Sequence, residues 1–355
     1  KRAFLHMNFQ TRNRQGEWRR KGVLPGWVAS FLCVLAMTGY AQTALFVTEY
    51  GTGYLRAFNF SGPSGVPLTV PPSYSPIAGS SEAADGMVTG LDGRLLINRG
   101  DGVIHRRSLD GTSFDEFTTV SVNQPLLDVS RNATHLFAAE FGSSTLHQIA
   151  LDTGAATLLA GPPDLDSADG VRVGPDDRLY VVDSSDGQIF AYDFSSFTWS
   201  TFLSTPPTVG IASQMEFYGN QYVFLSRTIG SQARIYRYTL FTPGDYSSGL
   251  DSNSETLIGS LGNGTATGIR IGPDGRLYAN NFGSGEVWRS TVGIMSWETS
   301  PYVTGLSEPA SIYFALIPEP LSGSIFGLML AAWVCWRRQT ASAPADHAGP
   351  SATAD

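Results

Sequence analysis

The chain of 355 residues carries 23 Lys plus Arg against 31 Asp plus Glu, a formal net charge of −8. Between Gly22 and Trp336 it contains 14 Arg, no Lys and 28 Asp or Glu, which gives that part a net charge near −14. A domain this acidic repels phosphate backbones and anionic lipid surfaces, so nucleic-acid binding is disfavoured, and covalent catalysis through lysine is excluded there.

The first 41 residues have the composition of a secretory signal peptide. Seven Lys or Arg and only one acidic residue, Glu17, precede the apolar run Val23 to Met37, and small residues flank Tyr40 in Gly39-Tyr40-Ala41. A basic segment, an apolar segment and a small-residue cleavage site in this order predict export, with residues 1–41 removed. Met7 is a second possible start of translation.

Cysteine usage agrees with export. Cys33 lies in the leader and Cys335 in the C-terminal apolar segment. The part of the chain between them therefore has no thiol for a disulfide, a metal site or a nucleophile.

One sixteen-residue pattern recurs along the chain. ADGMVTGLDGRLLINR at 84–99, ADGVRVGPDDRLYVVD at 168–183 and ATGIRIGPDGRLYANN at 266–281 align without gaps. Each copy has the pattern of a strand, a Gly/Pro/Asp turn and a second strand, and a repeat of this length is typical of solenoids and propellers.

Six copies follow when the remaining sequence is aligned on the L-Y pair that begins the second strand. The expected second strands are Leu45–Glu49, Leu95–Arg99, Leu136–Glu140, Leu179–Asp183, Tyr222–Ser226 and Leu277–Asn281. Third strands are expected at 54–60, 103–109, 145–151, 188–194, 234–240 and 286–292, and fourth strands at 155–160 and 198–203. The longest spacing contains the polar segment Pro243 to Glu255, which is expected to be a loop. No helical periodicity competes between residues 42 and 317, so the fold class is all-β.

The ends of this region predict how the ring closes. The first copy lacks an innermost strand, because Leu45 follows almost directly on the cleavage site, and Ser307 to Leu316 has the pattern of the missing strand. Pairing of the two ends would protect edges that an open array exposes. Residues 42–317 are therefore expected to form a six-bladed β-propeller; an irregular β-sandwich would not explain six copies in register.

The segment after Leu316 has three parts in a fixed order. Pro318-Glu319-Pro320 precedes a mostly apolar run at 321–336 and the pair Arg337-Arg338. The arrangement resembles the PEP-CTERM sorting signal of Gram-negative bacteria. This resemblance implies a transmembrane helix at 321–336 in the inner membrane, a sorting protease of the exosortase type, and a propeller outside the inner membrane. Residues 339–355, rich in Ala, Ser and Pro, are expected to be a disordered tail.

Two sets of residues are expected to meet at one face of the ring, where innermost strands begin and second strands end. The first set is Asp85, Leu126, Asp169, Ala212 and Thr267, with Glu308-Pro309 in the closing blade. The second set is Glu49, Arg99, Glu140, Asp183, Ser226 and Asn281. Oxygen ligands from several blades would suit Ca²⁺ or another divalent cation. The structural alternative is that these side chains cap turns through their oxygens.

The histidines offer little support for catalysis. His105 and His147 align with Phe190, Tyr236 and Trp288 in the third strands, a position that favours ring packing. Because no rim position holds a histidine, a Ser-His-Asp hydrolase has no evident base.

The repeats, with LYVVD and LYANN after a GPDG-type turn, resemble the NHL and SMP-30/gluconolactonase group of six-bladed propellers over most of residues 44–316. In the lactonases of that group a Glu, Asn residues and an Asp in a P-D-G-M motif hold a divalent metal. The resemblance implies that Asp85 and Asp169 match this Asp and that Glu308 matches the Glu. The Asn positions are not matched, since the position one blade before Asp169 is Leu126.

Three functions remain open from the sequence. The leading hypothesis is a non-catalytic, exported propeller of the cell envelope that binds a glycan, a surface polymer or exopolysaccharide, or a protein partner. The alternative is a metal-dependent, lactonase-like hydrolase that uses Asp85, Asp169, Glu140, Asp183 and Glu308. A purely structural interaction module would have no small-molecule site.

Overall fold

The structure is a computed structural model that describes residues 42–60, 84–109, 111–120, 126–208, 210–294 and 296–317. Within these ranges the secondary structure consists of strands, β1 to β22. The same ranges contain no helix of the length and apolar character needed to cross a membrane. The expected signal peptide at 1–41, the sorting segment 318–338 and the tail 339–355 lie outside the described residues.

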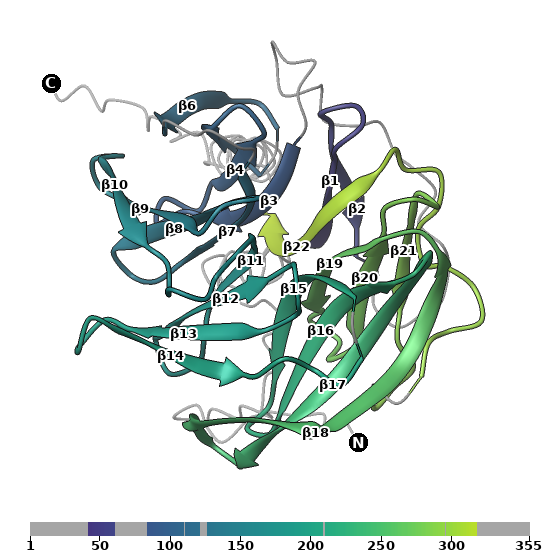
Figure 1. Cartoon of the computed structure of the whole chain (residues 1–355). Helices are drawn as coiled ribbons and strands as arrows, with labels where there is room; N and C mark the ends of the chain where they lie inside the picture. Colours follow the sequence, from purple (N-terminus) through teal and green to yellow (C-terminus); the bar gives the residue numbers. More distant parts are fainter. Residues whose placement is uncertain are drawn as a thin grey trace, which may run out of the picture. The chain divides into compact units, whose positions relative to one another are not determined.

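The strands form six antiparallel sheets, which are the six blades of a propeller (Figure 1). From the axis outward, blade 1 contains β22 (Pro309–Ile317), β1 (Gln42–Glu49) and β2 (Leu55–Asn59); blade 2 contains β3 (Ala84–Thr89), β4 (Leu95–Arg99), β5 (Val103–Arg107) and β6 (Phe114–Thr119); blade 3 contains β7 (Leu126–Arg131), β8 (His135–Glu140), β9 (Thr145–Ala150) and β10 (Ala156–Ala160). Blade 4 contains β11 (Ala168–Val173), β12 (Leu179–Asp183), β13 (Ile189–Asp193) and β14 (Thr198–Leu203); blade 5 contains β15 (Ile211–Tyr218), β16 (Tyr222–Ile229), β17 (Gln232–Thr242) and β18 (Asp245–Asn263); blade 6 contains β19 (Ala266–Ile271), β20 (Leu277–Asn281) and β21 (Glu286–Arg289).

The ring closes as the sequence predicts. The innermost strands contact one another in the order β22, β3, β7, β11, β15, β19 and back to β22. In blade 1 the C-terminal strand β22 pairs antiparallel with the N-terminal strand β1, from Gln42↔Ile317 to Glu49↔Pro309, and Figure 1 shows the two side by side near the centre. Residues from both ends of the domain thus share one sheet, so neither end is left as an open edge.

One part of the secondary-structure prediction is wrong. The segment Pro243 to Glu255, expected to be a loop, mostly belongs to β18, a strand of 19 residues that pairs with β17 through several register shifts. This strand is the outer edge of its blade and exposes many side chains, so it lacks the apolar alternation of a half-buried strand. Hydrogen bonds to β17 and the burial of Leu250, Ile258 and Leu261 hold it in place.

Aromatic side chains fill the spaces between blades. The ring of Tyr180 in blade 4 lies 4.6 Å from that of Phe202 and 4.9 Å from that of Phe217 in blade 5, both edge-on, measured between centroids. His105 and His147 occupy the expected ring position and are buried, 7% and 2% exposed. His105 pairs with Ile97 and His147 with Ala138. These partners hold the same place in their strands as Val181, the partner of Phe190 in blade 4.

Three glycines set how closely the blades approach at the axis. A β-carbon added to Gly86, Gly170 or Gly268 would lie within 3.0 Å of the backbone of the next innermost strand: 2.6 Å from Asp128 Cα, 2.2 Å from Ser213 O and 2.9 Å from Ser311 Cα, respectively. Each glycine lies at an irregularity where the innermost strand shifts register against its neighbour. The glycines therefore permit close backbone packing rather than complete a turn.

Candidate functional site

A cavity of about 520 Å³ opens at the axis, on the face where innermost strands begin. We refer to it as the axial cavity. It is lined by Tyr50, Asp85, Phe141, Asp169, Ile211, Ser213, Gln214, Thr265, Thr267, Phe282 and Ala310. The innermost strands of five blades contribute residues and blade 3 contributes Phe141, so the cavity is a property of the whole ring.

Strand register decides which side chains reach the floor of this cavity. In blade 4, Ala168 pairs with Asp183 and Val171 with Val181, so Asp169 and Gly170 both lie opposite Val182. The same two-residue bulge occurs in the other blades. Its first position is Asp85, Leu127, Asp169, Ser213, Thr267 and Ala310, and its second is Gly86, Asp128, Gly170, Gln214, Gly268 and Ser311.

In this register Asp85, Asp169 and Thr267 occupy the first bulge position, whereas Leu126 and Ala212 lie one residue before it. Leu126 pairs with Glu140 as Ala168 pairs with Asp183, so Leu127, not Leu126, is the counterpart of Asp169. The reason is that the turn between the paired residues of β7 and β8 is one residue shorter than the turn in blade 4. Ala212 pairs with Arg227, so Ser213 is the counterpart in blade 5. The residue of blade 5 that corresponds to Leu179, the first of the second strand in blade 4, is therefore Val223 and not Tyr222.

Asp128 is a buried carboxyl that the repeat alignment misses. It occupies the second bulge position, which is glycine in blades 2, 4 and 6, and is 1% exposed. Its Oδ1 accepts a hydrogen bond from Val129 N at 2.9 Å and its Oδ2 one from Val171 N at 3.1 Å, across the blade interface. The signal in the sequence is the shorter turn of blade 3, which displaces this strand by one residue.

Burial raises the pKa of all three carboxyls, and neighbouring carboxylate charge raises it further for Asp85 and Asp169. Burial, followed by the charges of Asp169 and Asp128, raises the pKa of Asp85 well above its usual value. Burial and the charge of Asp128 raise the pKa of Asp169 to about 7, although a hydrogen bond from Ser213 opposes the shift. Burial raises the pKa of Asp128 to about 7, with the Arg172 guanidinium and the two backbone N–H groups opposing it. The floor therefore gains negative charge as the pH rises through neutrality.

An apolar rim surrounds the mouth of the axial cavity. Tyr50 and Phe282 are the first residues after β1 and β20, and their ring centroids lie 5.7 Å apart at 58°. Phe141, the first residue after β8, is 39% exposed, and Ile211 at the start of β15 is 53% exposed. The backbone N–H groups of Tyr50 and Phe282 bond to Glu308 O and Thr265 O, which fixes these residues beside the innermost strands.

Most of the second predicted set anchors loops. Asp183 accepts hydrogen bonds from Asp166 N at 2.9 Å and from the backbone and hydroxyl of Ser185. Glu49, fully buried, accepts from Ser307 N at 3.0 Å and pairs with Arg56 at 3.1 Å. In both cases the carboxylate holds the chain entering from the preceding blade, which is the turn-capping alternative that the sequence left open.

Asn281 and Arg227 repeat this role with donors instead of acceptors. Asn281 Nδ2 donates to Leu261 O at 2.9 Å and to Asn263 O at 3.0 Å. Arg227, not Ser226, is the blade 5 counterpart of Asp183; it donates to Thr208 O and pairs with Glu255 at 3.1 Å.

In blades 2 and 3 the equivalent residues pair with neighbours of their own sheet. Arg99 lies 2.7 Å from Asp101 and 3.2 Å from His105 Nε2. Glu140 lies 3.5 Å from His147 Nε2. Neither lines the axial cavity, so the second set does not converge on a ligand there.

The described residues do not fit the metal site that the lactonase resemblance implies. Glu308 is exposed, has a φ of 50°, and lies beside Gly51 outside the axial cavity. Within the described ranges no group of three or more His, Cys, Asp or Glu side chains could hold a metal ion. We therefore derive no step through a metal at Asp85, Asp169 and Glu308.

Deeper in the channel the charge is balanced. Arg172 Nη2 donates to Glu216 Oε2 at 2.6 Å and to Met215 O at 3.1 Å, and Arg270 Nη1 lies 3.6 Å from the same carboxylate. Arg131 donates to Thr89 O. Burial raises the pKa of Glu216, and Arg172 opposes that shift. Arg172, whose charge acts on Asp128, is thus already paired with another carboxylate.

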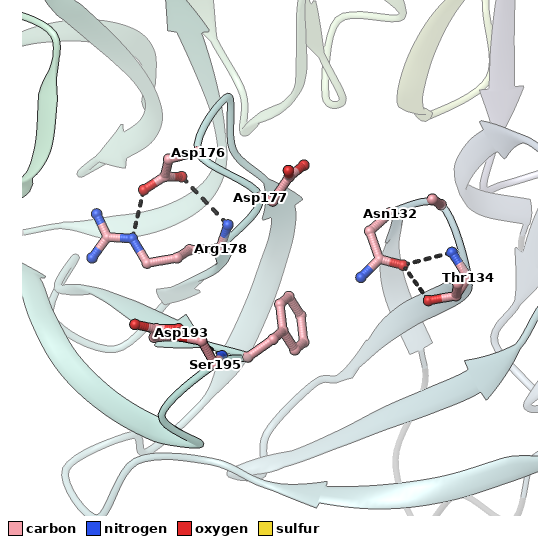
Figure 2. A pocket seen from close by; sticks show the side chains of 9 residues that line it. Asn132, Thr134, Asp176, Asp177, Arg178, Asp193 and Ser195 are labelled. Carbon is pink, nitrogen blue, oxygen red and sulfur yellow. Dashed lines mark hydrogen bonds and ion pairs between the residues drawn. The ribbon is translucent and has the colours of Figure 1, made fainter.

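A second hollow, of about 600 Å³, lies on the opposite face between blades 3 and 4 (Figure 2). Its polar side chains satisfy one another: Asp176 binds Arg178 and the Tyr180 hydroxyl, and Asn132 binds Thr134. Asp177, with a φ of 61°, completes the GPDD turn that the sequence predicts. These are turn-capping residues, so the axial cavity is the better candidate site despite its smaller volume.

No protein-family model matches the chain, and the comparison with curated proteins gives no match. Among solved structures, one described as a nidogen/laminin complex superposes with a TM-score of 0.59 at 12% identity, covering 77% of this chain and 98% of that chain. Virginiamycin B lyase from Staphylococcus aureus superposes with a TM-score of 0.52 at 15% identity, covering 76% and 87%. At these identities the similarity concerns the fold alone. The protein is an all-β, six-bladed β-propeller.

Proposed function

We propose that this protein is a non-catalytic binding propeller of the cell envelope, whose protein partner docks over the axial cavity. The observation that carries the proposal is the cavity itself: an aromatic rim encloses a floor with buried acidic groups, on a closed six-bladed ring. Concave sites with apolar walls and a few convergent polar groups are the usual form of binding sites. Asp85 and Asp169 lie at its floor, and among its described lining residues there is no His, Cys or Lys.

A protein partner is favoured over a glycan or exopolysaccharide. The propeller is strongly acidic, so an anionic surface polymer would be repelled. Exposed Phe141 and Ile211, together with the Tyr50–Phe282 ring pair, form the kind of aromatic and aliphatic patch on which protein interfaces are centred. The solved structure described as a nidogen/laminin complex is a protein assembly with a similar fold.

Photo-cross-linking from the rim tests this proposal. A photoreactive phenylalanine analogue at Phe141 or Ile211 of the full chain, expressed in its own cells, should give a discrete protein adduct. The adduct should be absent with the analogue at Leu158, which is 72% exposed on the outer strand β10, and should disappear with excess unlabelled protein. Equal adducts from all three positions, or none from the rim, would reject the proposal. A carbohydrate adduct would reject the protein partner.

We also propose that the propeller is exported by residues 1–41 and retained by the segment Pro318 to Arg338, as the PEP-CTERM resemblance implies. Deletion of 318–338 should move the protein from the membrane fraction to the soluble exported fraction. A deletion of equal length within the tail is impossible, so removal of 339–355 alone serves as the control and should leave fractionation unchanged. Unchanged fractionation after the first deletion would overturn the sorting proposal.

A further inference from the structure

The floor of the axial cavity collects hydrogen-bond acceptors that lack a positively charged partner. Asp85 and Asp169 are each 8% exposed and come from β3 and β11. Asp128 of β7 lies beneath them and is 1% exposed. The charged neighbours that shift the pKa of Asp85 are the other two carboxyls, and the one that shifts the pKa of Asp169 is Asp128, so no cation offsets the charge of either side chain.

Gln214 provides an independent sign of a missing ligand. It lines the axial cavity, is 3% exposed, and its Oε1 has no hydrogen-bond partner among the described residues. A buried amide oxygen without a donor is destabilising relative to a satisfied one. Such an orphaned acceptor, beside two buried carboxyls, calls for a ligand that donates several hydrogen bonds.

The side chains of β11, β15 and β19 around the floor do not supply that donor. On β15, Ser213 already bonds to Asp169. On β19, Thr267 Oγ1 donates to Pro309 O at 2.9 Å, and Arg270 is directed to Glu216. On β11, Arg172 donates to Glu216 and Met215 O, and of the three floor carboxyls its charge lowers the pKa of Asp128 alone.

The rim favours an organic cation over a metal ion. No group of described carboxylates and imidazoles has the arrangement for a metal. By contrast, the faces of Tyr50, Phe282 and Phe141 can receive a cation on its way to the floor, and Ile211 can pack on an aliphatic stem.

We propose that the axial cavity binds a guanidinium or ammonium group, the tip of a basic side chain of the partner, with Asp85, Asp169 and Gln214 as its hydrogen-bond acceptors. This inference rests on the proposed function, because it names what the docked partner inserts. Planar guanidinium groups donate several hydrogen bonds to carboxylates, and such charge-assisted bonds are the stronger ones. Asp128 contributes charge from below without contacting the ligand.

The proposal has a pH signature with a definite sign. The pKa values of Asp169 and Asp128 are about 7, whereas a guanidinium stays protonated throughout the neutral range. The cavity therefore binds the cation more tightly as the pH rises through 7, where Asp169 and Asp128 ionise, and loses it as the pH falls. A bound cation also lowers the carboxyl pKa values, so binding at pH 7 releases protons.

Calorimetric titration of the full chain with two probes tests the inference: agmatine, and the blocked peptide acetyl-Gly-Arg-Gly-amide. The matched control is the same peptide with citrulline, which has the shape of arginine without its charge. We expect the arginine peptide to bind at pH 8, at least tenfold tighter than the citrulline peptide and at least tenfold tighter than at pH 5.5. Tighter binding of the peptide than of agmatine assigns the site to a protein side chain; the reverse assigns it to a free amine.

Variants and proton counting complete the test. Asp85→Asn and Asp169→Asn should each weaken binding at least tenfold, and Asp177→Asn, in the exposed turn on the opposite face, should not. Titrations in two buffers of different ionisation enthalpy should show proton release by the unmodified protein, which keeps the test valid if a variant fails to fold. Equal binding of both peptides, or no proton release, would overturn the inference. If rim cross-linking still succeeds in that case, the proposed function stands alone; if it also fails, both are wrong.

Discussion

Asp169→Asn should stabilise the propeller at alkaline pH, although it removes a charged residue from the candidate site. The pKa of Asp169 rises from 3.8 to about 7 on folding, chiefly through burial and then through Asp128. A raised carboxyl pKa means that the folded state holds the proton more tightly than the unfolded chain. Asp169 therefore causes stability to fall as the pH rises from about 4 to about 7, and the loss is complete above 7.

The magnitude follows from the size of this shift. Each pKa unit corresponds to about 1.4 kcal/mol, so about three units give about 4 kcal/mol as an upper bound. Because Asp128 titrates near the same pH and shares the repulsion, we expect Asp169→Asn to gain about 2 to 4 kcal/mol at pH 8. Asn resembles the protonated carboxyl in shape, so the gain at pH 4 should be close to zero.

Urea unfolding at pH 4, 6 and 8, for the unmodified protein and the variant, measures the effect. A gain of this size corresponds to a melting temperature about 5 to 15 °C higher at pH 8. His105 and His147, whose pKa values are lowered by burial, change the pH profile of both proteins equally, so they cancel in the difference. Asp177→Asn, at an exposed turn with a positive φ that Asn tolerates, is the control. A variant that is no more stable than the unmodified protein at pH 8 would refute the argument.

Three further outcomes are expected. Gly170→Ala should lower the unfolding free energy by about 1 to 3 kcal/mol, since its β-carbon would lie 2.2 Å from Ser213 O. An unchanged melting temperature in calorimetry would contradict the packing role of this glycine. Asp183→Ala should cost about 1 to 3 kcal/mol by leaving Asp166 N and Ser185 N without their acceptor, yet leave arginine-peptide affinity unchanged in titration; a loss of affinity would place Asp183 in the site. Removal of β22 (Pro309–Ile317) should abolish cooperative unfolding, because it opens the ring at blade 1, and a retained sharp transition would contradict the role of that closure.

Part of the site follows from local sequence and part does not. Asp85 and Asp169 are found by alignment because their blades share turn length and bulge position, so one offset fits both. Asp128 and Gln214 are missed by the same offset. In blade 3 the turn after the innermost strand is one residue shorter, and in blade 5 the second strand starts at Val223. Each difference shifts the innermost strand by one position, and a shift of one residue exchanges the side chain that faces the axis.

The sequence alone determined the inner strands of each blade, the six-fold repetition and the pairing of the two ends, because period-two alternation and Gly/Pro/Asp turns act over a few neighbouring residues; it did not show the outer strand β18. The tertiary structure decided which side chains meet. Asp85, Asp128 and Asp169 are about 40 residues apart along the chain, and only closure of the ring brings them to one floor and removes them from water. Burial of all three, and the carboxylate charge next to Asp85 and Asp169, exist only in that arrangement and give these ordinary aspartates their raised pKa values.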